Sequence, residues 1–184
     1  MQLRNRRYFF MQTATKNGIF LRRIVFASLF CAMSIVLGKY LAFTALTVRF
    51  SFENLPILAA GIMLGPVLGC VVGVVADLIG CVLVGYEINL IITLGAATVG
   101  FLSGVICRLV RRPFALRIAL SVAVAHLFGS VCVKSLGFFV YYGTPYIPVF
   151  IERLGVYAII AVAEILILTL LFSNKGIKML AEKV

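Results

Sequence analysis

The chain has 184 residues, of which 63% are hydrophobic and only 12% are charged. Because soluble globular domains carry about 45–50% apolar and about 25% charged residues, this composition excludes a soluble enzyme and a disordered chain. The net charge of +11 could suggest a nucleic-acid partner, but most lysines and arginines fall into three clusters, which is the positive-inside pattern of a polytopic membrane protein. The clusters are Arg4, Arg6, Arg7, Lys16, Arg22 and Arg23; Arg108, Arg111, Arg112 and Arg117; and Lys175, Lys178 and Lys183.

The N-terminal half of the chain contains three predicted spans after a cytoplasmic tail over residues 1–20. The first span runs from about Ile24 to Ala42. The next apolar stretch is too long for one crossing, since about 20 residues suffice. It contains Gly65-Pro66, and proline suits the first turn of a helix but not its interior. The sequence therefore predicts a short second span over about 52–64 and a third over about 66–84, packed antiparallel.

The C-terminal half contains three further predicted spans. The fourth covers Ile88 to Cys107, and a basic loop separates it from the fifth, which runs from about Leu116 to Tyr141. A turn with two prolines leads to the sixth span, over about 149–172, and a tail over 173–184 follows. Six spans return the C-terminus to the side of the N-terminus, which agrees with basic clusters at both ends and between the fourth and fifth spans.

The predicted fold is therefore an all-α integral membrane bundle of six helices within residues 24–172, with both termini in the cytoplasm. The whole chain, 1–184, forms a single membrane domain. The five cysteines lie inside apolar runs without CxxC spacing, so we interpret them as small apolar filler and not as a disulfide framework or a metal site.

Small residues recur every four positions on several predicted spans. Lipid provides little hydrophobic drive for helix association, so such faces are typical of helices that approach closely. For the third to fifth spans we expect this packing to lie inside the chain. The repeats are Gly61, Gly65, Gly69 and Gly73; Ala96, Gly100 and Gly104; and Ala125 with Gly129.

The first span carries two adjacent pairs of small residues, Ala27 with Cys31 and Ser28 with Ala32. Their spacing permits either packing within the chain or docking of a separate membrane subunit. The spacing alone does not choose between these alternatives.

Three cations outside the basic clusters, Arg49, Lys134 and Arg153, are predicted to gather in the outer half of the bundle. Tyrosines near a membrane surface can form an interfacial belt, and arginines can snorkel to headgroups. Convergence of cations and aromatic rings instead favours a site for a flat aromatic ligand that carries carboxylates. The accompanying residues are Tyr86, Asn89, Thr93, Phe138, Phe139, Tyr141, Tyr142, Tyr146 and Tyr157.

Other polar residues lie nearer the middle of the predicted membrane. Charges there are costly and usually face the bundle interior with a partner or a task. Asp77 can accept hydrogen bonds from the amino or ring N–H groups of a ligand, or it can neutralise Lys134. His126 and Glu164 are interpreted as structural polar contacts and not as ligand contacts.

Motifs for enzymatic chemistry are absent from the sequence. There is no GxxxxGK[ST] phosphate loop, no HExxH and no zinc-ligand spacing, so we predict no enzyme activity, no catalytic residues, no metal and no cofactor. A proton-coupled secondary transporter is harder to exclude, because Asp77 and Glu164 could carry protons, although no repeated half with discontinuous helices is evident.

Three segments resemble the S components, the substrate-capturing subunits of energy-coupling factor (ECF) vitamin transporters. RRIVFASLFCAMSIVL at 22–37 is similar to the first helix of that family with its small-residue docking motif. RFSFENLPILAAGIMLGPVLGCVVGVVADLIG at 49–80 resembles the glycine-rich second and third helices. YGTPYIPVFIER at 142–153 looks like the folate-specific branch, in which an arginine opens the last helix.

The resemblance implies a multi-pass subunit of a prokaryotic cell membrane that captures folate outside and releases it inside. Its implied partners are a transmembrane coupling subunit, docked on Ala27, Ser28, Cys31 and Ala32, and two cytoplasmic ATPases that use the ATP. The alternatives are an S component for another vitamin and a stand-alone proton-coupled carrier. The implied ligand contacts are Arg49, Asp77, Tyr86, Asn89, Thr93, Lys134, Phe138, Tyr141, Tyr142, Arg153 and Tyr157.

Overall fold

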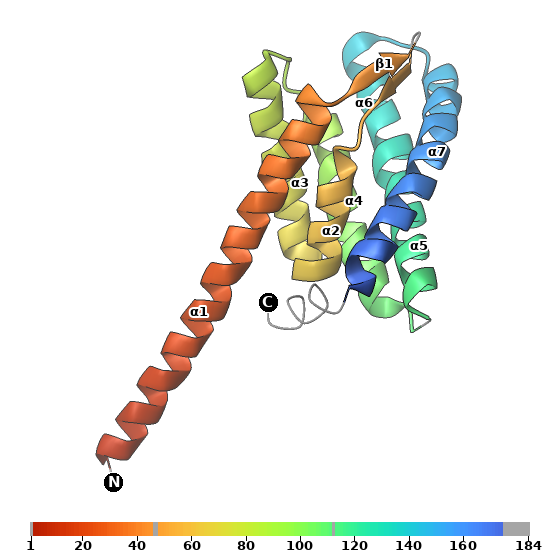
Figure 1. Cartoon of the computed structure of the whole chain (residues 1–184). Helices are drawn as coiled ribbons and strands as arrows, with labels where there is room; N and C mark the ends of the chain where they lie inside the picture. Colours follow the sequence, from red (N-terminus) through yellow and green to blue (C-terminus); the bar gives the residue numbers. More distant parts are fainter. Residues whose placement is uncertain (1, 46–47, 112, 175–184) are drawn as a thin grey trace.

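A computed structural model of the chain describes residues 2–45, 48–111 and 113–174. Helices dominate it, and two short π-helices and one small hairpin interrupt them (Figure 1). In chain order the elements are α1 (Gln2–Ile35), the π-helix η1 (Val36–Tyr40), β1 (Phe43–Ala45), β2 (Val48–Phe50), α2 (Asn54–Leu64), α3 (Pro66–Val84), α4 (Leu90–Leu109), α5 (Phe114–Ala125), the π-helix η2 (His126–Val133), α6 (Lys134–Tyr142) and α7 (Tyr146–Ser173).

Five helices of the described chain are long and apolar enough to cross a membrane. The predicted second span is different, because α2 has only 11 residues and reaches about 16 Å, roughly half the hydrocarbon thickness. The prediction of six full spans is therefore not confirmed. The five candidates are Gly18–Tyr40, Pro66–Val84, Leu90–Leu109, Phe114–Tyr142 and Tyr146–Ser173.

A short antiparallel hairpin precedes the short helix α2. β1 pairs with β2 in a register that places Phe43 opposite Phe50, and the pair lies at one end of the bundle, here called the hairpin end (Figure 1). From there residues 51–53 lead into α2 as non-helical chain. Irregular backbone inside a membrane protein is tolerated where it lines a cavity. The all-α prediction missed this hairpin.

The break predicted at Gly65-Pro66 is confirmed. Gly65 has φ +103°, a conformation that glycine adopts without steric cost, and Pro66 opens α3. The guanidinium of Arg108, near the end of α4, lies where a Cβ of residue 65 would be. The turn between α2 and α3 therefore requires glycine at residue 65, both because φ is positive and because a side chain there would collide with Arg108.

The glycine repeats bring α2, α3 and α4 into backbone contact. A Cβ on Gly100 of α4 would collide with the carbonyl oxygen of Gly69 in α3, and a Cβ on Gly61 of α2 would collide with the Gly100 carbonyl oxygen. A Cβ on Gly129 of η2 would likewise be too close to the Gly95 carbonyl oxygen of α4. The small-residue faces of the third to fifth predicted spans therefore pack within the chain, as expected. Close backbone approach supplies the dispersion contacts that lipid-exposed helices otherwise lack.

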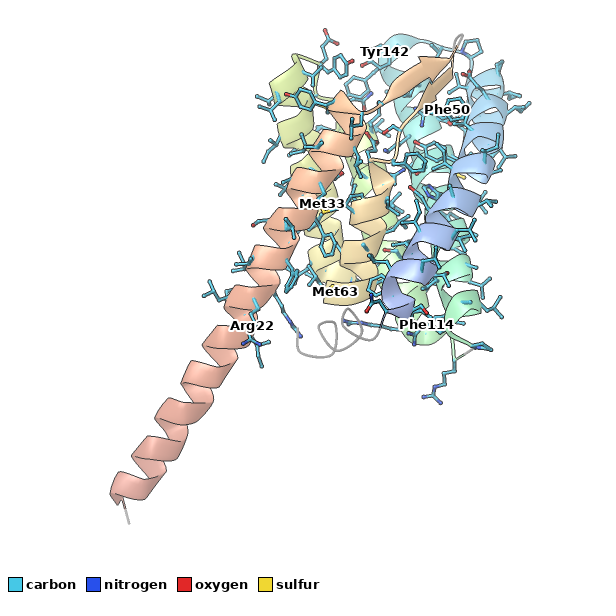
Figure 2. All side chains as sticks on the ribbon, viewed as in Figure 1. Arg22, Met33, Phe50, Met63, Phe114 and Tyr142 are labelled. Carbon is cyan, nitrogen blue, oxygen red and sulfur yellow. The ribbon has the colours of Figure 1, made fainter. Side chains whose placement is uncertain are left out.

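The remaining helices pack around this core. α1 packs against α2 and α3, whereas α5, η2 and α6 pack against α4, and α7 packs on α5, η2 and α6. Figure 2 places Tyr142 at the hairpin end and Arg22, Met63 and Phe114 toward the opposite end. The third basic cluster used to predict the orientation, Lys175, Lys178 and Lys183, lies outside the described residues.

The predicted fifth span is a composite of α5, η2 and α6 and not a uniform α-helix. The π-helix covers His126–Val133. Such i→i+5 segments are rare and occur mostly as short bulges, often at functional sites. The fifth span predicted at about 116–141 agrees with the candidate span Phe114–Tyr142. Hydrophobic periodicity does not reveal the change of hydrogen bonding at its centre.

Backbone contact between α3 and α4 makes Gly100 sensitive to one added methyl group. We expect Gly100→Ala to lower the free energy of unfolding in detergent by about 2 kcal/mol, because overpacking forces two backbones apart. In Gly155→Ala the new Cβ meets no atom within 4 Å, so this helical control should raise stability by up to about 1 kcal/mol. Chemical unfolding followed by circular dichroism would measure both. Equal stability of the two variants would contradict this packing.

Candidate functional site

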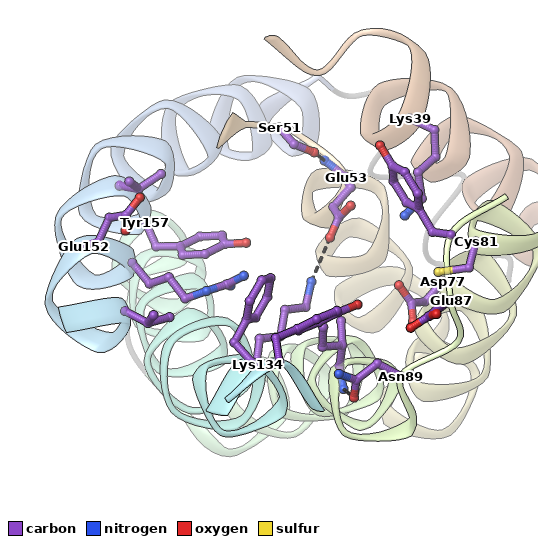
Figure 3. Close-up of a pocket in the computed structure, with 17 residues that line it drawn as sticks. Lys39, Ser51, Glu53, Asp77, Cys81, Glu87, Asn89, Lys134, Glu152 and Tyr157 are labelled. Carbon is purple, nitrogen blue, oxygen red and sulfur yellow. Dashed lines mark hydrogen bonds and ion pairs between the residues drawn. The ribbon is translucent and has the colours of Figure 1, made fainter. Parts of the chain in front are cut away.

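A cavity of about 570 Å³ opens among the helices at the hairpin end (Figure 3). Its walls come from η1, residues 51–53, α3, α4, α6 and α7. Its volume falls in the range of small-molecule sites, which is roughly 300–1,000 Å³. The non-helical segment that precedes α2 contributes Ser51 and Glu53 to the wall.

Most of the ligand contacts predicted from the sequence line this cavity. They approach it from α3, α6 and α7 and from the loop before α4, and Figure 3 shows Asp77 and Tyr157 on opposite sides of it. The lining members of the predicted set are Asp77, Tyr86, Asn89, Lys134, Phe138, Tyr142, Arg153 and Tyr157.

Three predicted contacts are not part of the lining. Thr93 is buried behind it, and its hydroxyl donates a hydrogen bond of 2.7 Å to Asp77 Oδ2. Tyr141 is 47% exposed and is not among the lining residues. Arg49 lies on β2, and its side chain is outside the described part of the structure.

Lys134 forms the central ion pair of the cavity. Its side chain is 2% exposed, and its Nζ donates a hydrogen bond of 2.7 Å to Glu53 Oε1, drawn as a dashed line in Figure 3. The alternative that Asp77 neutralises Lys134 is therefore wrong, because the carboxylate paired with Lys134 is that of Glu53. Glu53 immediately precedes α2, and only the fold brings it to Lys134.

Asp77 and Asn89 form the α3–α4 side of the cavity. Asn89 Oδ1 accepts hydrogen bonds from the amides of Ile91 and Ile92, which caps α4, and its Nδ2 donates to the Gly137 carbonyl oxygen at 3.1 Å. Asn89 therefore fixes the start of α4 against α6. Asp77 receives one hydrogen bond from Thr93, which orients the carboxylate at the cavity wall.

Two cations lie against aromatic rings of the lining. The guanidinium carbon of Arg153 is 4.5 Å from the centroid of Phe138, and the Nζ of Lys39 is 5.6 Å from that of Tyr86. Cation–π contacts of this kind hold a positive charge in place without neutralising it. Lys39 was not predicted as a site residue, although it is the one charge inside the first predicted span.

The cavity presents charges of both signs. The sequence analysis predicted cations and one carboxylate, but the lining also contains three glutamates that were not proposed as contacts. A ligand that fits such a site brings hydrogen-bond donors as well as an anionic group. The lining carboxylates are Glu53, Asp77, Glu87 and Glu152, and the lining cations are Lys39, Lys134 and Arg153.

The predicted docking residues divide between two faces of α1. Cys31 is 8% exposed and belongs to the hydrophobic core, and Ala27 packs against that core. Ser28 and Ala32 are exposed. An added side chain on the exposed pair would point away from the bundle, whereas one at Cys31 would disturb the interior.

Comparison with known proteins identifies both the family and the fold. The family model described as "ECF transporter, substrate-specific component" matches residues 22–179. Among solved structures, the crystal structure of FolT bound with folic acid matches with a TM-score of 0.66 and 20% sequence identity, over 83% of this chain and 93% of that one. No curated protein matches the sequence.

The Lys134–Glu53 pair yields a prediction about stability. Lys134→Met leaves the Glu53 carboxylate without its ammonium partner, and we expect a loss of about 2 kcal/mol of unfolding free energy, since removing one member of a buried pair is strongly destabilising. Adding Glu53→Gln should recover part of this loss. Glu87→Gln, at an exposed lining residue, is the control and should change stability by less than about 0.5 kcal/mol. If Lys134→Met alone were as stable as Lys134→Met with Glu53→Gln, the Lys134–Glu53 ion pair would not stabilise the fold.

Proposed function

This chain belongs to the family of ECF transporter substrate-specific components, and from that membership we propose that it captures folate for an ECF importer. The fold and family are those of substrate-binding subunits of transporters, and five apolar helices make the chain a multi-pass membrane protein. The proposed location is the plasma membrane of a prokaryotic cell, with the cavity facing outward.

One observation carries the proposal of folate: a carboxylate and a guanidinium on opposite walls of one ring-lined cavity. Asp77, on α3, is positioned to accept hydrogen bonds from the amino and ring N–H groups of the pterin. Arg153, on α7, is positioned to bind a glutamate carboxylate of folate. Charge-assisted hydrogen bonds of this kind contribute about 1.5–3 kcal/mol each.

The aromatic side chains support the same ligand class. Tyr86, Phe138, Tyr142 and Tyr157 line the cavity between these two groups. Stacking on such rings is worth about 0.5–1.5 kcal/mol beyond the area buried. The pterin and benzoyl rings of folate are flat enough to use these surfaces. The similarity in fold to FolT, whose crystal structure contains folic acid, also supports the proposal.

The mixed charge of the cavity supports folate over a plain anion. The charge of Lys134 is already balanced by Glu53, so this ammonium group offers a dianionic ligand little uncompensated charge. A folate molecule has donors for the carboxylates as well as acceptors for the cations. We therefore assign Arg153 and not Lys134 as the main anchor of the glutamate carboxylates.

Release of the vitamin into the cell requires energy, and the sequence contains no phosphate-binding loop that would use ATP to supply it. In the proposed importer, two ATPases and a coupling subunit provide this energy. The coupling subunit docks on α1 at the exposed pair, Ser28 and Ala32.

Isothermal titration of the purified chain with a panel of vitamins tests the ligand. We expect binding of folate and no heat with thiamin, riboflavin, biotin or pantothenate. Tight binding of another vitamin without a folate response would overturn the proposal of folate and leave the family unchanged. Uptake that needs no ATPase partner but collapses with the proton gradient would instead support a stand-alone carrier.

Replacement of Arg153 tests the anchor. We expect Arg153→Ala to weaken folate binding about 10-fold to 100-fold, because a charge-assisted hydrogen bond worth about 1.5–3 kcal/mol is lost. Arg22→Ala is the matched control, since Arg22 is exposed near the opposite end of the bundle (Figure 2). Titration calorimetry measures both dissociation constants. The same affinity in both variants would remove Arg153 from the site.

Bulky substitutions on α1 test docking. We expect Ser28→Trp with Ala32→Trp to abolish folate uptake in cells that also produce the coupling subunit and ATPases, while folate binding is retained, because the exposed small-residue face is lost. Ile159→Trp changes a 65% exposed residue of α7 and should leave uptake intact. Normal uptake by the doubly substituted chain would show that this face is not the docking surface.

A further inference from the structure

A chain of four buried polar side chains joins α2, η2 and α7 but takes no part in lining the cavity. Asn54 Nδ2 donates to Ser130 Oγ at 3.1 Å, and the same hydroxyl lies 3.0 Å from His126 Nδ1. His126 Nε2 is paired with Glu164 Oε2. Asn54, Ser130 and Glu164 have no exposed surface, and His126 is 3% exposed.

Such a chain is costly in an apolar bundle. Taking an imidazole and a carboxylate out of water carries a desolvation penalty, and a pair of this kind is weak evidence for stability by itself. The fold could fill the same space with leucine and phenylalanine. We therefore expect this polar chain to have a role that apolar packing could not fulfil.

The first link to the cavity is a ring stack. The centroids of His126 and Tyr157 are 5.1 Å apart, and the planes are inclined by 28°. Tyr157 lines the cavity, whereas His126 lies behind it. The orientation of the imidazole therefore limits the orientation of a ring that faces the ligand space.

The second link runs through the π-helix. The Lys134 N–H bonds to the carbonyl oxygens of Gly129 and Val131, where a regular α-helix would direct it to Ser130. The Ser130 carbonyl oxygen accepts a hydrogen bond of 3.2 Å from Arg153 Nη1. Ser130 therefore contacts His126 through its side-chain hydroxyl and Arg153, the proposed anchor, through its backbone carbonyl oxygen.

We propose that His126, fixed by Ser130 and Glu164, is a positioning residue that sets ligand affinity from beneath the cavity. It orients Tyr157 through the ring stack and Arg153 through Ser130. The effect on affinity rests on the proposed function, because it requires that Tyr157 and Arg153 contact the ligand. The coupling between His126 and the cavity side chains is independent of which ligand binds.

His126 is the only histidine in the sequence, so its imidazole gives unambiguous signals in selectively ¹⁵N- and ¹³C-labelled protein purified without a histidine tag. In the absence of any ligand, Tyr157→Leu should shift the ring proton signals of His126, because the stacked ring current is lost. Arg153→Gln should also shift them, through Ser130. Unchanged signals in both variants would overturn the coupling.

Binding measurements test the consequence for affinity. His126→Phe with Glu164→Leu preserves volume and an aromatic ring beside Tyr157, but it removes the contact of His126 with Ser130 and its pairing with Glu164. We expect this double variant to stay folded and to bind folate about tenfold more weakly, a loss equivalent to about 1.4 kcal/mol. Ser121→Ala removes another fully buried serine hydroxyl, one bonded to the Arg117 carbonyl oxygen on α5, and should bind as the unsubstituted chain does.

The outcomes separate the two proposals. A folded double variant with unchanged folate affinity overturns the positioning role. If the double variant does not fold, saturating folate added to the unsubstituted chain decides instead: shifted His126 signals support the role, and unshifted signals overturn it. Absence of folate binding by the unsubstituted chain overturns the proposed ligand, while the ligand-free spectra still test the coupling of His126 to Tyr157 and Arg153.

Discussion

The need to neutralise the ammonium group of Lys134 inside an apolar bundle organises the hairpin end of this protein. Lys134 is buried on α6, and the carboxylate that meets it comes from Glu53, which lies 81 residues earlier in the chain. Neutralisation therefore requires the chain before α2 to enter the bundle. The Ser34 hydroxyl, which donates to the Glu53 carbonyl oxygen at 2.7 Å, and Gly38, whose missing side chain leaves room for Glu53, both belong to this arrangement. The cavity forms around this pair.

Much of the fold follows from local sequence rules. Gly65 and Pro66 mark a break that needs a positive φ and a helix start, and the boundaries 66–84 agree with α3. The hairpin and the π-helix escaped prediction for a different reason. β1 and β2 are only three residues long each and pair at the end of the bundle. The π-helix η2 is joined by hydrogen bonds to Asn54 on α2 and, through His126, to Glu164 on α7. These partners are set by tertiary packing and not by periodicity.

The candidate site was predictable in kind but not in its pairings. Height along predicted helices was enough to bring Lys134 and Arg153 to one end of the bundle, where both line the cavity. Asp77, predicted nearer the middle of the membrane, lines the same cavity. Rotation about each helix axis decides which side chains meet, and sequence spacing does not give this rotation between helices. For this reason Glu53 and not Asp77 binds Lys134, and Tyr142 lines the cavity while Tyr141, which is about equally exposed, does not.

The non-helical connection at residues 51–53 makes the position of Glu53 unusually dependent on chain length. The backbone of Glu53 is held by two serines, because its N–H donates to Ser51 Oγ and its carbonyl oxygen accepts from the Ser34 hydroxyl. Deletion of one residue here would shift the carboxylate by about 1.5 Å or more, and a shift of that size takes a hydrogen bond of 2.7 Å beyond its range. Related chains that keep this ion pair should accordingly tolerate substitutions in this connection far more readily than insertions or deletions.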